Sequence, residues 1–207
     1  MVEEVFKERL NHYLSNPRDP EFNFMLGIEY FSKKQYAPAL SFFLRCAELH
    51  HNVDVVYECL IKTWQCIDLV GGRPLSAMAQ LEHAINLCPT RPEAYYLLSC
   101  VYEKSTEWFK CYHYSSIGNT FSTEDHAPLR TDVGYPGSTA ILFMKSVAAW
   151  FVGRRDEAKK LSLQHFLDMS TPKNLRSNTR HNLLNLGVPE ELIKRVESTM
   201  SVVESIS

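Results

Sequence analysis

The chain has 207 residues, of which 45% are hydrophobic and 22% charged, so it can form a folded core but is too short for a large multidomain enzyme. Its 22 Lys and Arg residues face 24 Asp and Glu residues, and this balance argues against nucleic acid as the main partner. Only 8 glycines accompany 10 tyrosines and 11 phenylalanines, a composition that favours long, well-packed helices.

The N-terminal segment, residues 1–16, is predicted to be a capping helix because its apolar residues recur at helical spacing. Pro17 ends this helix, and Asp19 is placed to cap the next one. Residues 1–4 are acidic and lack the basic region of a secretion signal, and no run of about 18 apolar residues occurs in the chain. We therefore expect a cytoplasmic protein without a membrane span.

Residues 20–170 are expected to form about four helical pairs, because small and large side chains alternate there as helix–turn–helix packing requires. The pairs are placed at about 20–52, 55–89, 91–120 and 139–170. In the second pair the interval from Leu60 to Ala77 is about four residues too long for a 34-residue period, which predicts an insertion in the turn. Residues 172–207 are expected to form C-terminal capping helices, because a stack of repeats needs solvated ends.

A long loop is predicted at residues 119–138, where two prolines and two glycines stand among polar residues. Long loops in compact domains are often functional. Arg130 and Asp132 are expected to form an opposite-charge pair in this loop, and Tyr135 precedes a proline that stiffens it.

The first pair resembles the tetratricopeptide repeat (TPR) over all its anchor positions, with Asn23 in place of the usual Trp and His51 in place of the usual Pro. The residues that carry the resemblance are Leu26, Gly27, Tyr30, Tyr36, Ala39, Phe43 and Cys46. It implies an all-α, right-handed TPR-like α-solenoid of about four helical pairs with capping helices at both ends. The implied function is recognition of a protein or peptide partner, without catalysis.

A narrower resemblance covers roughly residues 80–170. The segments 91–98, 129–137 and 148–153 look like helical-repeat regions associated with family-2-type glycosyltransferases of bacteria, phages and large viruses. This resemblance implies an accessory role, in which the chain docks a glycosyltransferase or its acceptor. A generic peptide-binding adaptor and a helical enzyme stay open as alternatives, and so does homodimerisation through an end helix.

Seven residues are the candidate binding residues, because the first helix of each pair lines the concave face of stacked repeats and the loop lies beside it. They are Phe24, Lys62, Tyr96, Glu103, Arg130, Asp132 and Tyr135. Aromatic rings with charged groups suit a carbohydrate or a peptide. The alternatives are that the aromatic residues pack in the core and that the loop charges only pin the loop.

No catalytic residue, cofactor or metal site is predicted. Walker, dinucleotide-binding and nucleophile-elbow motifs are missing from the sequence, as are Asp-x-Asp and the Cys-x-x-Cys pair typical of structural zinc. The six cysteines are expected to be reduced thiols, since a chain with a full core needs no disulfides. His50, at a predicted helix end, is expected to cap free carbonyl groups.

Overall fold

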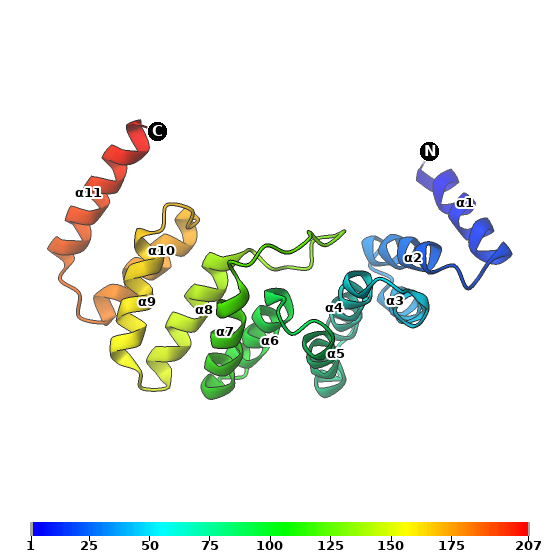
Figure 1. The fold of residues 1–207 in the computed structure, drawn as a ribbon, viewed down its shortest axis with the longest axis horizontal. Helices are drawn as coiled ribbons and strands as arrows, with labels where there is room; N and C mark the ends of the chain where they lie inside the picture. The colour runs from blue at the N-terminus through cyan, green and yellow to red at the C-terminus, as the bar shows by residue number, and fades with distance from the viewer. Residues whose placement is uncertain (1, 207) are drawn as a thin grey trace. The chain divides into compact units, whose positions relative to one another are not determined.

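The computed structural model describes the backbone of residues 2–206 and the side chains of Glu4 and residues 6–200, and within this range it contains eleven α-helices and no β-strand. The prediction of an all-α fold is confirmed. In chain order the helices are α1 (Val2–Ser15), α2 (Pro20–Ser32), α3 (Tyr36–Leu49), α4 (Val53–Val70), α5 (Pro74–Leu87), α6 (Pro92–Lys104), α7 (Trp108–Phe121), α8 (Ser138–Phe151), α9 (Arg155–Leu167), α10 (Lys173–Asn185) and α11 (Glu190–Ile206) (Figure 1).

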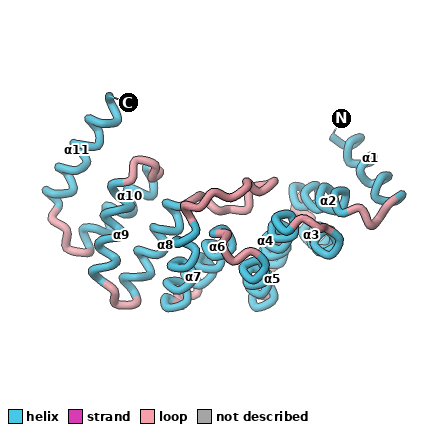
Figure 2. The backbone as a smooth tube through the Cα atoms, in the orientation of Figure 1, coloured by secondary structure: helices cyan, strands magenta, loops and turns pink. Residues whose placement is uncertain are grey.

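The described chain divides into two compact units, and the division falls within α6. Unit 1 contains the described residues up to Ala94 together with Asp125–Gly134, and unit 2 contains Tyr95–Glu124 together with the described residues from Tyr135 onward. The segment Asp125–Gly134, called the insert below, is part of the long non-helical stretch between α7 and α8 (Figure 2). It therefore packs with unit 1 although helices of unit 2 flank it in the sequence.

Local signals set the ends of the helices in unit 1. Asp19 caps α2, since its Oδ1 accepts hydrogen bonds from the amides of Glu21 and Phe22 at 2.9 and 3.3 Å. Asn52 caps α4 in the same way, with Oδ1 2.9 Å from the amide of Asp54. Gly71 ends α4 at a φ of 80°, a left-handed conformation that favours glycine.

The second helical pair corrects one expectation from the sequence. The turn after α4 spans residues 71–73 and the turn after α2 spans residues 33–35, so neither turn is the longer one. The extra residues lengthen α4, which has 18 residues against 13 in α2. The continuous apolar pattern of α4 carries the helix on until the glycines at 71 and 72 stop it.

Helices cross closely where a residue is small. A Cβ on Gly27 would lie 2.7 Å from the ring of Phe43, and a Cβ on Gly118 would lie 2.6 Å from the Cβ of Tyr95. Four further small residues of the helices are at most 2% exposed. These are Ala39, Ala77, Cys111 and Ala158. Small side chains let the backbones approach and let large neighbours fill the space around them.

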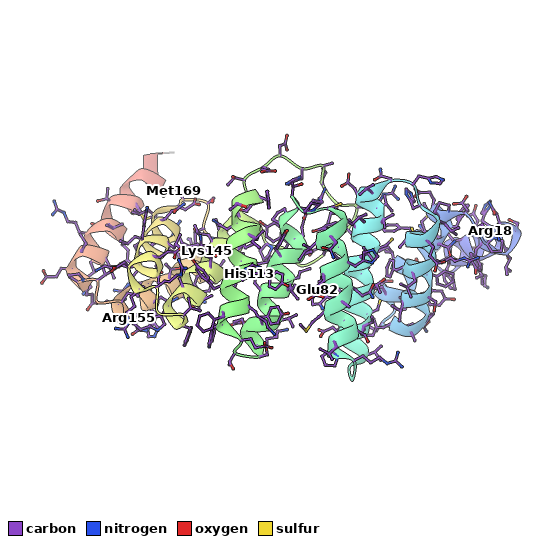
Figure 3. The ribbon with its side chains drawn as sticks, turned by 60° about the horizontal axis from the view of Figure 1, so that its bottom comes forward. Arg18, Glu82, His113, Lys145, Arg155 and Met169 are labelled. Atoms are coloured by element: carbon purple, nitrogen blue, oxygen red, sulfur yellow. The ribbon has the colours of Figure 1, made fainter. Side chains whose placement is uncertain are left out.

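Unit 2 carries a polar network along α7, α8 and α9. The hydroxyl of Tyr112 lies 2.8 Å from Oε2 of Glu157, and the ammonium group of Lys145 lies 3.5 Å from Oε1 of the same carboxylate. Lys145 is labelled on its helix in Figure 3. In the described part of the chain, none of the helices is long and apolar enough to cross a membrane.

Candidate functional site

The insert runs along α4 and is held there mainly through its main chain. Contacts to residues 130–131, 132 and 133 of the insert come from Glu58, Lys62 and Gln65 in turn. Seven residues of helix rise about 10 Å, so these contacts extend over two turns of α4. The insert itself is non-helical and bends at residues 130, 131 and 134.

Glu58 contacts two consecutive residues of the insert. Its Oε2 accepts a hydrogen bond from the amide of Arg130 at 2.8 Å, and its Oε1 accepts one from the hydroxyl of Thr131. The side chain is 1% exposed, so the hydrogen bonds replace the water that the buried carboxylate has lost.

Lys62 and Gln65 bind carbonyl groups further along the insert. Lys62 Nζ donates to the carbonyl oxygen of Asp132 at 2.7 Å, and Gln65 Nε2 donates to that of Val133 at 3.1 Å. Lys62 is 4% exposed, and burial lowers the pKa of its ammonium group, while the negative charges of Glu58 and Asp132 act in the opposite direction. The ammonium group also lies over the ring of Phe31, whose centroid is 5.0 Å away.

The guanidinium group of Arg130 makes a two-pronged ion pair with Glu21, with distances of 2.7 and 3.1 Å, and lies 5.3 Å from the centre of the Phe24 ring. The hydrogen bond from Arg130, followed by that from His50, lowers the pKa of Glu21 to about 2. Nε2 of His50 lies 2.9 Å from Oε1 of Glu21, and Nδ1 of His50 accepts a hydrogen bond from the amide of Asn52.

The expected pair of Arg130 with Asp132 does not form. The carboxylate of Asp132 instead accepts a hydrogen bond from the amide of Gly134 at 2.7 Å, which holds the turn at the end of the insert. Arg130 is drawn to Glu21 because a planar guanidinium group matches a carboxylate that offers both oxygens.

Arg91 holds the other end of the insert. Its Nη2 donates to the carbonyl of Ala127 at 3.0 Å and to Glu93 at 2.8 Å, while Nη1 donates to Asp54 at 3.0 Å. The hydroxyl of Tyr57 donates to Glu93 at 3.2 Å and accepts the amide of Ala94 at 2.9 Å. This network fixes Arg91, which is 4% exposed, in one orientation toward the insert.

The residues that hold the insert by hydrogen bonds include five that are called the anchor residues below: Glu21, Glu58, Lys62, Gln65 and Arg91. Of these, the sequence singled out only Lys62 as a binding residue. The sequence also contained a pattern from which Glu58 and Gln65 could have been found. Their spacing from Lys62 places all three residues on one face of a helix, at i, i+4 and i+7. Nothing in the sequence indicated that Glu21 would meet a loop residue 109 positions away.

The remaining candidates lie in unit 2. The rings of Tyr96 and Tyr135 are 5.5 Å apart between centroids, at an angle of 57°, and both residues are half-buried. Burial raises the pKa of the Tyr96 hydroxyl. Glu103 is half-buried on α6, two turns after Tyr96. Phe24, Lys62, Arg130 and Asp132 belong to unit 1.

Side chains that bind metals do not cluster. Among the described residues, no three His, Cys, Asp or Glu side chains are arranged to hold a metal ion. All six cysteines are free thiols. Burial raises the pKa of Cys66 and of Cys111 to about 12, which keeps both protonated at neutral pH.

No protein-family model matches the chain, and no curated protein matches it. Several solved structures do match. The PilF protein of Pseudomonas aeruginosa matches with a TM-score of 0.62 and 14% identity, over 85% of this chain and 72% of that one. MamA matches with a TM-score of 0.59 and 19% identity, over 77% and 84%. A thermophilic TPR protein of Thermus thermophilus matches with a TM-score of 0.55 and 17% identity, over 88% and 91%.

These similarities establish an all-α, TPR-like fold. The TPR resemblance is therefore confirmed at the level of the fold. The comparisons provide no link to glycosyltransferases.

Proposed function

We propose that this chain is a protein-interaction scaffold, and that the anchor residues of unit 1 bind a non-helical polypeptide segment. TPR-like neighbours support a scaffold role at the level of the fold. The partner's main chain would lie along α4, as the insert does.

The observation that carries this proposal is that four of the five anchor residues bind main-chain atoms. Lys62, Gln65 and Arg91 each donate to a carbonyl oxygen, and Glu58 accepts from an amide. Main-chain groups are present in every peptide, so a surface that binds them gives affinity, and contacts to side chains then give specificity.

Burial of charge favours binding over simple attachment of a loop. Glu58 and Lys62 are almost completely buried, and buried charges cost free energy unless their hydrogen bonds are satisfied. Apolar side chains would attach a loop at a lower cost. Glu58 and Lys62 instead bind main-chain groups of the insert, and every peptide offers such groups.

The test uses the full chain with a weakened insert, the double variant R130A/T131A. A fluorescent peptide with the sequence of residues 125–134, capped at both ends, is titrated with this variant, and fluorescence anisotropy reports binding. We expect saturable binding, and at least a tenfold loss when E58Q is added, because a neutral amide pairs less strongly with the peptide. Absence of binding at the highest soluble protein concentration, with helical content intact, would contradict the proposal.

A second candidate function is docking of a glycosyltransferase or its acceptor, as the narrower sequence resemblance implies. The observation that favours it is the half-buried aromatic pair of Tyr96 and Tyr135 in unit 2, since aromatic faces cover the apolar faces of sugars. Y96A or Y135A is then expected to weaken binding of a glycan or transferase by about 1 to 3 kcal/mol without loss of helix. Normal binding by both variants would remove this candidate.

A further inference from the structure

We propose that the insert is an intramolecular ligand, which occupies the binding surface in the resting protein and displays the chemistry of the partner. The partner segment is a non-helical peptide in which a basic residue precedes a residue with a hydroxyl group, as Arg130 precedes Thr131. This inference rests on the proposed function of the anchor residues.

The preference for a basic residue follows from the placement of Glu21 beside an aromatic ring. Glu21 receives the guanidinium group of Arg130, and the Phe24 ring lies beneath that group. Aromatic rings and carboxylates together select a cation, and they favour Arg because it pairs through two hydrogen bonds.

The preference for a hydroxyl group follows from Glu58. This carboxylate accepts the amide of one residue and the hydroxyl of the next, so both oxygens are used only if the second residue carries a donor. An apolar residue at that position would leave one oxygen of a buried carboxylate without its hydrogen bond.

The insert also closes the surface that it contacts. With the insert in place, Glu58 is 1% exposed, Lys62 4% and Arg91 4%, so a second peptide cannot reach these groups until the insert leaves. A ligand tethered by short linkers competes at an effective concentration of roughly millimolar. Only molecules whose insert has been released can bind the partner. The apparent affinity of the wild-type chain for the partner is therefore reduced in proportion to the fraction of molecules that are open.

The first experiment compares the affinity of the peptide of residues 125–134 for the wild-type chain and for R130A/T131A. We expect binding to the double variant to be at least tenfold tighter, because its own insert no longer competes. A second peptide carrying R130E and T131V is expected to lose at least tenfold in affinity for the double variant. Equal affinity of the two proteins, or of the two peptides, would overturn the inference and leave the proposed function standing.

If neither protein binds either peptide, the proposed function fails together with the inference. A second measurement is independent of the peptide and of any change in the insert. Trypsin cleaves after Arg130 only when the insert is released, so E58Q should be cleaved there at least tenfold faster than the wild type. The control is E82Q, an exposed glutamate on α5 that is labelled in Figure 3. Equal cleavage rates for E58Q and the wild type would overturn the inference.

Discussion

The ammonium group of Lys62 lies 2.7 Å from the carbonyl oxygen of Asp132, although 70 positions separate the two residues in the chain. The contact joins the middle of α4 to a non-helical segment that follows α7 in the sequence. Unit 1 is therefore completed by residues far along the chain. The insert covers the face of α4 that carries Glu58 and Lys62.

The pH dependence of Glu21 provides one prediction. Its pKa of about 2 lies below the ordinary value of 4.5, because Arg130 and His50 stabilise the carboxylate. A carboxyl group with a lowered pKa stabilises the folded form above its ordinary pKa, and this contribution disappears as the pH falls through the folded value. We expect attachment of the insert to weaken between about pH 4.5 and 2.

An NMR titration of the Glu21 carboxyl carbon tests this prediction. The expected midpoint is near 2 in the wild type, and R130Q should move it up toward the ordinary value because the main stabilising partner is removed. A wild-type midpoint near 4.5 would mean that the ion pair of Glu21 with Arg130 does not persist in solution.

The network around Tyr57 provides a second prediction. Y57F removes the hydroxyl group that donates to Glu93 and accepts a hydrogen bond from the amide of Ala94. Both partners are buried, and each then lacks this hydrogen bond. The expected cost is about 1 to 3 kcal/mol in the free energy of unfolding, measured by urea denaturation. Y36F, at a half-buried tyrosine of α3, is the control and should change stability much less.

The small residues at the helix crossings were predictable from the sequence, because their spacing follows from helix geometry and packing. Ala39 and Ala158 are both completely buried, as a tight crossing requires. The site was only partly predictable. Lys62 lies on a face of α4 and Arg130 in the insert, as their places in the sequence indicate, but the contact of Arg130 with Glu21 depends on the path of the insert. No local pattern encodes that path.

A third prediction concerns Gly118. An added methyl group would lie 2.6 Å from the Cβ of Tyr95, an atom that cannot move without its backbone. Alanine usually stabilises a helix relative to glycine, yet here G118A is expected to lower stability by about 1 to 3 kcal/mol. Thermal unfolding by circular dichroism measures the change, with T120A at an exposed position of α7 as the control. A higher melting temperature for G118A would contradict the packing of α6 on α7.

The reactivity of the thiols gives a fourth prediction. Burial raises the pKa values of Cys66 and Cys111 to about 12, so almost none of either thiol is ionised at about pH 8. Iodoacetamide followed by peptide mapping should modify the half-buried Cys88 and Cys100 first. All six cysteines should react after denaturation. Modification of Cys66 as fast as Cys88 in the folded protein would show that α4 is not closely packed around Cys66.

Displacement of the insert by peptide tests the central claim most directly. Hydrogen–deuterium exchange of the wild-type chain is measured with and without a saturating amount of the peptide of residues 125–134. This peptide carries no dye but contains a heavy-isotope residue, so that it is distinguished from the insert by mass. Because both segments require Glu58 and Lys62, we expect exchange in the insert to rise at least tenfold while α4 stays protected. Bound peptide with unchanged exchange in the insert would show that the peptide binds elsewhere and would contradict the account.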